Sequence, residues 1–195
     1  MLDREAASAR FYPVVDTQIR RLNWGCGGVG EPGWINTDVK EGPGIDLPAD
    51  ILEGLPLEDE SIDYVVSIHA LPEIHYDMQG PVLAELRRVL RPGGTLRLAL
   101  PDLEKVVAAY QRGDRDFFLI PDEDMQSLGG KLIAHLVWYG YSRTFFVPDF
   151  IEELLRKAGF AEVTHLSYME TASAHPGIVE LDNRENESLF VEATK

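Results

Sequence analysis

Cysteine is almost missing from this sequence: the 195 residues include one, Cys26. A single cysteine excludes a disulfide framework within the chain. Basic residues are also scarce, with 18 Lys and Arg against 33 Asp and Glu, which gives a formal net charge of −15. Nucleic-acid binding draws much of its affinity from Lys and Arg contacts to phosphates. We therefore expect no nucleic-acid partner, and an anionic membrane surface is disfavoured for the same reason.

Long apolar runs are absent as well. The longest ones fall far short of the ~20 residues that a membrane-spanning helix needs. The opening residues, MLDREAASAR, are charged and lack the apolar core of a signal peptide. We expect no membrane span, a cytoplasmic location and, from the length, one domain with a substantial core.

Glycine, in contrast, is concentrated between Arg21 and Asp38. A short apolar segment leads into a turn that holds Gly25, Gly27, Gly28 and Gly30, and a second apolar segment then ends at Asp38. Glycines let the backbone approach a ligand closely and allow positive φ in a tight turn. A carboxylate at the end of the next strand can accept hydrogen bonds from a ribose diol. The pattern therefore indicates a nucleotide or nucleoside site.

Two ligand classes use such a site. Gly25, Gly27 and Gly30 have the spacing of the dinucleotide fingerprint, which requires a helix opening at the turn and an acid about 20 residues further on. Here Pro32 and Gly33 interrupt any helix, and Asp38 follows Gly25 by only 13 residues. A nucleoside without a pyrophosphate fits this loop better than a dinucleotide does.

The remaining chain alternates between strand and helix patterns. Strands are expected at 20–24, 34–39, 45–49, 62–68, 95–100, 163–168 and 189–193. Helices are expected at 4–10, 81–90, 105–110 (capped by Asp102), 131–138 and 148–158. Pro92, Gly93 and Gly94 are expected to stop the helix before them. This alternation predicts an α/β fold, a Rossmann-like, doubly wound and mainly parallel sheet of about seven strands with helices on both faces. Ligands of such sheets bind at the carboxyl ends of the strands.

Several short motifs together resemble the class I S-adenosylmethionine-dependent methyltransferases of the type 11 group. They are Leu22–Gly27 (LNWGCG), Asp38, Asp50 with Leu55-Pro56 and Ser61–Asp63, Leu90–Gly94 (LRPGG) and Ala158–Phe160. The resemblance implies S-adenosylmethionine as the cofactor and an antiparallel last strand. One departure is Leu71–His75 (LPEIH), where many members read L-E-H, so the family's histidine is not assigned to a position here.

The resemblance also implies roles for individual residues. Gly25, Cys26 and Gly27 would face the methionine part of the cofactor through their backbone, and Asp38 would bind the ribose hydroxyls. Asp50 would contact the adenine amino group, and Ile51 would pack on the adenine ring. Two simpler interpretations remain open: Asp50 as the cap of a turn, and Cys26 as a small residue in a crowded loop.

His69 follows a buried strand and is the candidate catalytic residue, because the resemblance implies that this position contacts both cofactor and acceptor. A neutral imidazole can take a proton from a hydroxyl acceptor, and an unperturbed histidine titrates near pH 6.5. A His69 base therefore predicts turnover that falls below about pH 6.5. If the acceptor needs no deprotonation, His69 would only orient it. If a His69→Ala variant kept most of its turnover, Glu73 and His75 would be the next candidates.

The segment 113–146 is rich in aromatic residues and glycine and is predicted to form an acceptor pocket or lid within a single methyltransferase domain, 1–195. Tyr139 and Tyr141 are its candidate acceptor contacts, although a core role is equally open. His135 lies on an apolar helix face and is expected to be a hydrogen-bonded core histidine. The scattered histidines and single cysteine indicate no metal site.

The leading hypothesis is a methyltransferase acting on a small molecule, or on a glycan or lipid-linked intermediate, at oxygen, nitrogen or carbon. One alternative is a nicotinamide-dependent oxidoreductase, which the short distance from Gly25 to Asp38 disfavours. The other is a methyltransferase-like module that binds a cofactor or partner without catalysis.

Overall fold

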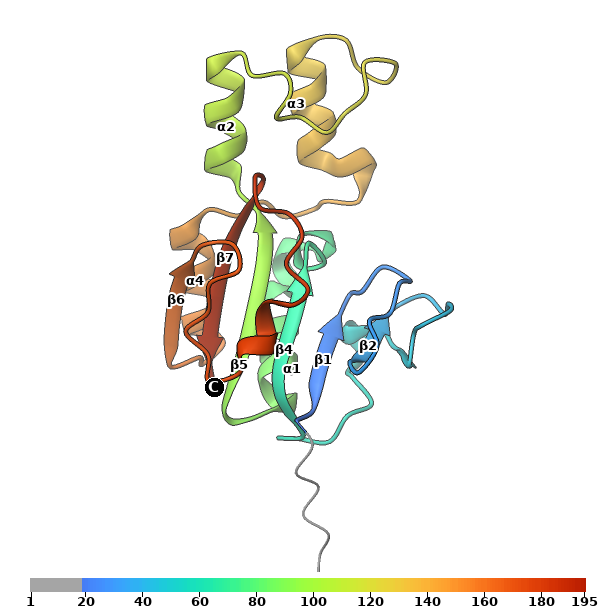
Figure 1. Cartoon of the computed structure of the whole chain (residues 1–195), viewed down its shortest axis with the longest axis vertical. Helices are drawn as coiled ribbons and strands as arrows, with labels where there is room; N and C mark the ends of the chain where they lie inside the picture. Colours follow the sequence, from blue (N-terminus) through green and yellow to red (C-terminus); the bar gives the residue numbers. More distant parts are fainter. Residues whose placement is uncertain (1–18) are drawn as a thin grey trace, which may run out of the picture.

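The computed structural model describes residues 19–195, and the helix expected at 4–10 lies outside them. Seven strands form one sheet in the order β3-β2-β1-β4-β5-β7-β6 (Figure 1). They are β1 Arg21–Trp24, β2 Ile35–Asp38, β3 Leu47–Pro48, β4 Ile62–Ile68, β5 Leu90–Pro101, β6 Glu162–Leu166 and β7 Ser188–Thr194. Neighbours from β3 to β5 pair in parallel, while β7 is antiparallel to both β5 and β6. The predicted mainly parallel, Rossmann-like sheet with an antiparallel last strand is confirmed.

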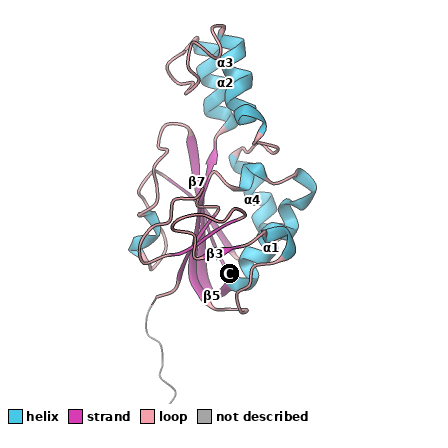
Figure 2. Cartoon of the chain, turned by 90° about the vertical axis from the view of Figure 1, so that its right-hand side faces the viewer, coloured by secondary structure: helices cyan, strands magenta, loops and turns pink. Residues whose placement is uncertain are grey.

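The two faces of the sheet are covered unequally. Helices α1 (Gln79–Val89) and α4 (Pro148–Lys157) lie side by side on one face (Figure 2). Their apolar residues, among them Val82 and Ile151, join the main core with Leu22 and Leu96 of the strands. On the opposite face the 3-10 helix η5 (Pro176–Val179) packs Ile178 against β4. The helical layer is thus mainly on one face of the described sheet.

Helices α2 (Leu103–Arg112) and α3 (Leu128–Val137) stand beyond the carboxyl end of the sheet (Figure 1). Asp102 begins α2 where β5 ends, because its Oδ1 accepts hydrogen bonds from the backbone of Glu104 and Lys105 at 2.9 and 3.3 Å. The two helices share a small core of Val106, Ala109 and Phe118. They place the aromatic part of the predicted lid above the strand ends.

The boundary between α1 and β5 differs from the expectation. The helix ends at Val89, and β5 begins at Leu90, so Pro92, Gly93 and Gly94 belong to the strand rather than to a helix stop. Gly93 donates its N–H to the carbonyl of Lys195 at 3.0 Å, and Lys195 donates to Gly94 at 2.9 Å. Pairing with the other end of the chain extends this strand, which a local pattern does not reveal. The third strand is shorter than predicted, only Leu47–Pro48.

Candidate functional site

An open cavity of about 1210 Å³ lies at the carboxyl ends of β1, β2, β3 and β4. Every predicted site residue lines it, namely Gly25, Cys26, Gly27, Asp38, Asp50, Ile51 and His69. These residues come from four separate strand ends and their loops. The strand order brings them together, because the carboxyl ends of parallel strands share one edge.

The glycine turn is shaped by two close approaches. The N–H groups of Gly25 and Cys26 both point at the carbonyl of Thr37, at 2.9 and 3.2 Å. A Cβ added to Gly25, whose φ is +69°, would lie 2.2 Å from the Cβ of Ala70. Around Gly27 and Gly28 there is nothing within 4 Å of such an atom. The turn is therefore tight on the sheet side and open toward the cavity.

No helix forms between β1 and β2 in the described chain. A dinucleotide site holds its pyrophosphate on the N-terminus of a helix that opens at the glycine turn. This loop has no such N-terminus, and the nicotinamide alternative loses its principal requirement.

Asp38 is fixed by the loop that it faces. Its Oδ2 accepts the N–H of Gly27 at 2.8 Å, and its Oδ1 accepts that of Lys40 at 3.2 Å. The carboxylate stays partly exposed and lines the cavity. Each carboxylate oxygen has a second lone pair, so Asp38 can still accept bonds from a ligand diol.

The structure agrees in part with two interpretations, Cys26 as a small residue in a crowded loop and Asp50 as the cap of a turn. Burial is the main cause that raises the pKa of the Cys26 thiol above its ordinary value, which keeps it protonated and unreactive. Asp50 does cap a turn: its Oδ1 accepts the N–H of Leu52 at 2.9 Å at the start of η1 (Ile51–Glu53). It also lines the cavity beside Ile51, so the capping bond holds the acid at the rim.

His69 directly follows β4 in a left-handed conformation with φ +58°. Its Nε2 lies 2.7 Å from the hydroxyl of Ser188, at the start of β7. Burial, helped by the positive charge of Arg184, lowers the pKa of His69 to about 3. With this pKa the imidazole stays neutral far below pH 6.5, so a His69 base would predict no fall in turnover near that pH.

A loop that sequence reasoning missed also reaches the cavity. Leu181, Asn183, Arg184 and Glu187, which precede β7, line it. The loop is tied to the sheet by Arg97, a fully buried residue of β5. Arg97 forms two hydrogen bonds to Asp182, at 2.5 and 2.9 Å, and one to Glu192 at 2.8 Å. A lone arginine in the apolar strand 95–100 was the one signal that could have pointed to this arrangement.

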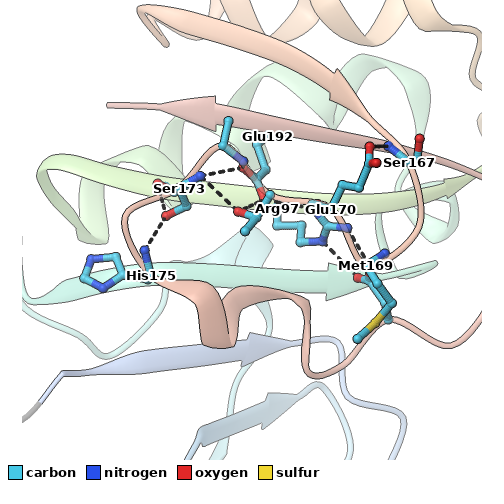
Figure 3. A network of polar contacts seen from close by, with 11 residues as sticks. Arg97, Ser167, Met169, Glu170, Ser173, His175 and Glu192 are labelled. Carbon is cyan, nitrogen blue, oxygen red and sulfur yellow. Dashed lines mark hydrogen bonds and ion pairs between the residues drawn. The ribbon is translucent and has the colours of Figure 1, made fainter.

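Figure 3 shows that the same network binds the segment between β6 and β7. Glu192 accepts hydrogen bonds from the N–H groups of Ala172 and Ser173, at 2.9 and 3.1 Å. Arg97 also donates to the carbonyl of Glu170 at 2.9 Å. The segment between β6 and β7 is thus anchored at several points before it reaches the cavity.

Of the predicted lid, only the part from α3 onward lines the cavity: His135, Trp138, Tyr141, Ser142 and Arg143. The carbonyl of Pro72 accepts the N–H groups of Arg143 and Thr144, at 2.8 and 3.1 Å, which holds this segment over the loop after β4. Tyr139 points elsewhere, because its hydroxyl donates to Asp124 at 2.5 Å on the surface. Tyr139 is therefore not a cavity residue, whereas Tyr141 is.

The other two candidates of the loop after β4, Glu73 and His75, also line the cavity. Burial first, and then the charge of Asp38, raises the pKa of Glu73. His75 is hydrogen-bonded to Arg143. His75 therefore helps to join the lid to the wall that also carries His69, and Glu73 adds a carboxyl group to the cavity lining.

His135 is buried, as expected, but the prediction that its hydrogen bonds are satisfied is wrong. Its ring packs between Phe117, Phe118 and Trp138, with centroid separations of 5.7, 5.6 and 6.1 Å. Its Nδ1 is buried and has no hydrogen-bond partner within the described residues.

Residues 19–195 contain neither a candidate metal site nor a helix that could span a membrane. No group of three or more His, Cys, Asp or Glu side chains in that range could hold a metal ion. No helix in that range has both the length and the apolar character to cross a membrane.

Comparison with known proteins also indicates a methyltransferase. Residues 23–98 match the family described as "Methyltransferase domain". The chain is 33% identical over 134 residues to a ubiquinone/menaquinone biosynthesis C-methyltransferase of Methylobacterium nodulans, a match that covers 62% of this chain and 47% of that protein. The match thus spans about half the length of that relative.

Two solved structures share the fold. A SAM-dependent methyltransferase of Thermotoga maritima, described as a possible histamine N-methyltransferase, has a TM-score of 0.57 at 22% identity, over 90% of this chain and 82% of its own. A SAM-dependent methyltransferase of Archaeoglobus fulgidus has a TM-score of 0.56 at 14% identity, over 91% and 86%. At these identities the likeness concerns the architecture.

Proposed function

We propose that this chain is a class I methyltransferase of the type 11 group and that it transfers a methyl group from S-adenosylmethionine to a small acceptor molecule. The observation that carries the proposal is the meeting of the glycine turn, Asp38, Ile51 and His69 around one cavity of about 1210 Å³. A single ligand site usually measures about 300–1,000 Å³. The cavity is large enough for an acceptor beside the cofactor.

The residues present fit this cofactor. Gly27 and Gly28 leave open space where the methionine part would approach the backbone. Asp38 offers a carboxylate for the ribose hydroxyls, and the buried Ile51 offers an apolar surface for the adenine ring. When bound, the cofactor supplies a methyl group already activated on a sulfonium.

The chain's own contribution is to position the acceptor and exclude water, which can supply roughly 7–11 kcal/mol of the barrier. We propose that the segment 128–143 forms the acceptor side of one methyltransferase domain, and that His69 is a neutral wall of the pocket that orients the acceptor. A glycan or lipid-linked intermediate would have to place its methylated end in the same cavity.

Cofactor binding gives the first test. S-adenosylhomocysteine should raise the melting temperature of the native chain, because a ligand that binds only the folded state stabilises it by mass action. NAD should not. Replacing Asp38 with alanine should weaken S-adenosylhomocysteine binding in calorimetry by about 10- to 100-fold, which corresponds to hydrogen bonds to a charged group of about 1.5–3 kcal/mol.

Asp59→Ala is the matched control, because Asp59 is an exposed carboxylate that contacts Arg88 away from the cavity. It removes the same charge and should leave the affinity unchanged. Stabilisation by NAD without stabilisation by S-adenosylhomocysteine would overturn the proposed function. Release of S-adenosylhomocysteine during turnover with an acceptor separates an enzyme from a binding module.

The lid gives the second test. Tyr141→Ala should lower kcat/KM for an acceptor by roughly tenfold, because it removes an aromatic wall worth about 1.4 kcal/mol in the transition state. Tyr139→Ala is the control, since this ring bonds Asp124 outside the cavity. Both variants should keep the affinity for S-adenosylhomocysteine within about twofold, as surface substitutions usually do. Equal losses in the two variants would contradict the assignment of Tyr141.

A further inference from the structure

The lining of the large cavity carries more negative than positive charge. Six carboxylates line it, against three Lys and Arg side chains; the carboxylates are those of Glu31, Asp38, Glu41, Asp50, Glu73 and Glu187. A cleft lined mainly by one sign of charge attracts ligands of the opposite sign. The proposed cofactor is cationic at its sulfonium, whereas S-adenosylhomocysteine has an uncharged sulfur. A carboxylate close to the sulfur could therefore distinguish the two ligands.

Some of these carboxylates are already bonded within the chain. Asp38 and Asp50 accept backbone N–H groups, and Glu187 pairs with Arg184. The carboxylate of Glu73 accepts no hydrogen bond within residues 19–195, and this residue is exposed at the cavity. Glu73 can therefore bind a cationic group of a ligand without first losing a partner in the described chain.

Two neighbours define where the Glu73 carboxyl group lies. The carbonyl of Ala70 accepts the N–H of Glu73 at 3.0 Å, and the Cβ of Ala70 is the atom that a Cβ on Gly25 would approach to 2.2 Å. Glu73 is thus one turn of chain away from the glycine turn. Its carboxyl group also lies close enough to Asp38 for that charge to raise its pKa, in addition to partial burial, which is the larger cause.

The same two neighbours are the groups assigned to either side of the cofactor's sulfur. Asp38 would hold the ribose, and the glycine turn would face the methionine part. The sulfur joins these two parts of the molecule. A side chain in the cavity that is near both Asp38 and the glycine turn is therefore near the sulfur, whereas Asp50 and Ile51 belong to the adenine end.

The loop that carries Glu73 is the 3-10 helix η2 (Leu71–Glu73) with the residues after it, and two other elements hold it. Gln79 of α1 is fully buried and donates from Nε2 to the carbonyls of Leu71 and Ile74, at 3.2 and 2.9 Å. On the lid side, the hydroxyl of Thr144 donates to the carbonyl of Ile74 at 2.9 Å. The backbone at Glu73 is thus fixed before a ligand binds, which lowers the entropy that binding costs.

We propose that Glu73 recognises the positive charge of the sulfonium, so that it strengthens the binding of S-adenosylmethionine but not of S-adenosylhomocysteine; this inference rests on the proposed function. When the methyl group is transferred, the carbon–sulfur bond breaks with its electron pair remaining on sulfur, and the charge that Glu73 attracts disappears. Glu73 therefore favours exchange of the product for new cofactor. Since this charge is already declining in the transition state, Glu73 acts on cofactor affinity rather than on the chemical step.

Calorimetry with three ligands tests the proposal. S-adenosylmethionine has a sulfonium at the relevant position and sinefungin has an ammonium there, whereas S-adenosylhomocysteine has no charge. Glu73→Gln keeps the size of the side chain and removes its charge. It should weaken the binding of both cationic ligands by about tenfold, or about 1.4 kcal/mol, the size of a charge contact partly screened by solvent. The affinity for S-adenosylhomocysteine should not change.

The amino acid group that all three ligands share separates the possible outcomes. Failure of all three ligands to bind the native chain overturns the proposed function. Binding to the native chain with equal losses for the three ligands in Glu73→Gln, or with no loss for any of them, overturns this inference alone. Equal losses would mean that Glu73 contacts the shared group or supports the loop.

Glu53→Gln is the matched control. Glu53 is likewise the last residue of a 3-10 helix of three residues, η1, and it is exposed, but it does not line the cavity. The substitution removes the same charge from the chain and should leave all three affinities unchanged. A tenfold loss for the cationic ligands in this variant too would show that the overall charge of the chain, not Glu73, selects them.

Carbon NMR of the side-chain carboxyl groups gives an independent measurement, with the Glu73 signal assigned by its loss in Glu73→Gln. The charged and titratable groups around Glu73 are Asp38, Lys40, Arg143 and, on its own loop, His75. They are present in every complex. Sinefungin should lower the pKa of Glu73, because a nearby cation favours the ionised form, whereas S-adenosylhomocysteine should not lower it, because it only displaces water. A fall in this pKa with both ligands, or with neither, would contradict the contact with the cationic group.

Discussion

Arg97→Ala should lower the free energy of unfolding by about 3–5 kcal/mol, because it leaves the buried carboxylates of Asp182 and Glu192 without their cation. For a chain of this size, such a loss corresponds to a fall in melting temperature of roughly 10 °C, measured by calorimetry or circular dichroism. The loop before β7 should loosen as well, since Asp182 would no longer be held. Because this loop lines the cavity, affinity for S-adenosylhomocysteine should fall together with stability.

Arg91→Ala is the matched control. Arg91 pairs with Asp63 at 2.6 Å, but its side chain is 40% exposed, and pairs of that kind are worth about 0–1 kcal/mol. If the two alanine variants lost the same small amount of stability, the buried network would not be what holds the loop. A second variant, Arg97→Met with Asp182→Leu and Glu192→Leu, tests the charges themselves, because a buried triad replaced by apolar residues is often neutral in stability.

Gly25→Ala should destabilise the chain by roughly 2–4 kcal/mol, which combines the cost of a left-handed alanine with the cost of overpacking. The physical reason is the Cβ, which would lie 2.2 Å from the Cβ of Ala70 at a φ of +69°. The turn would have to move away from the loop after β4, and the cavity would lose its shape at that point. Urea unfolding and calorimetry with S-adenosylhomocysteine measure the two effects.

Two further variants separate strain from collision. Gly28→Ala has the same backbone strain, with φ +82°, but meets nothing within 4 Å, so it should cost only about 1–2 kcal/mol. Ala70→Gly should rescue Gly25→Ala by removing the atom that it strikes. A double variant no more stable than Gly25→Ala alone would show that the close approach to Ala70 does not limit this position.

Much of the site was determined by the sequence itself. The turn from Gly25 to Gly30 and the acid at Asp38 are local features, because glycine spacing and strand length depend on a few adjacent residues. The alternation of strands and helices fixes parallel neighbours, and parallel neighbours bring Asp38, Asp50 and His69 to one edge. Each of these predicted residues lines the cavity, and the sheet topology is confirmed.

Only the tertiary structure decided the side of the cavity where we propose that the acceptor binds. Arg97 meets its partners 85 and 95 residues further along the chain, and no local pattern encodes such pairs. The pKa of His69 depends on burial by the assembled fold, and the unpartnered nitrogen of His135 depends on how α3 packs over the loop before β7. Local chemistry set the cofactor half of the cavity, whereas long-range packing and desolvation set the half where the acceptor would bind.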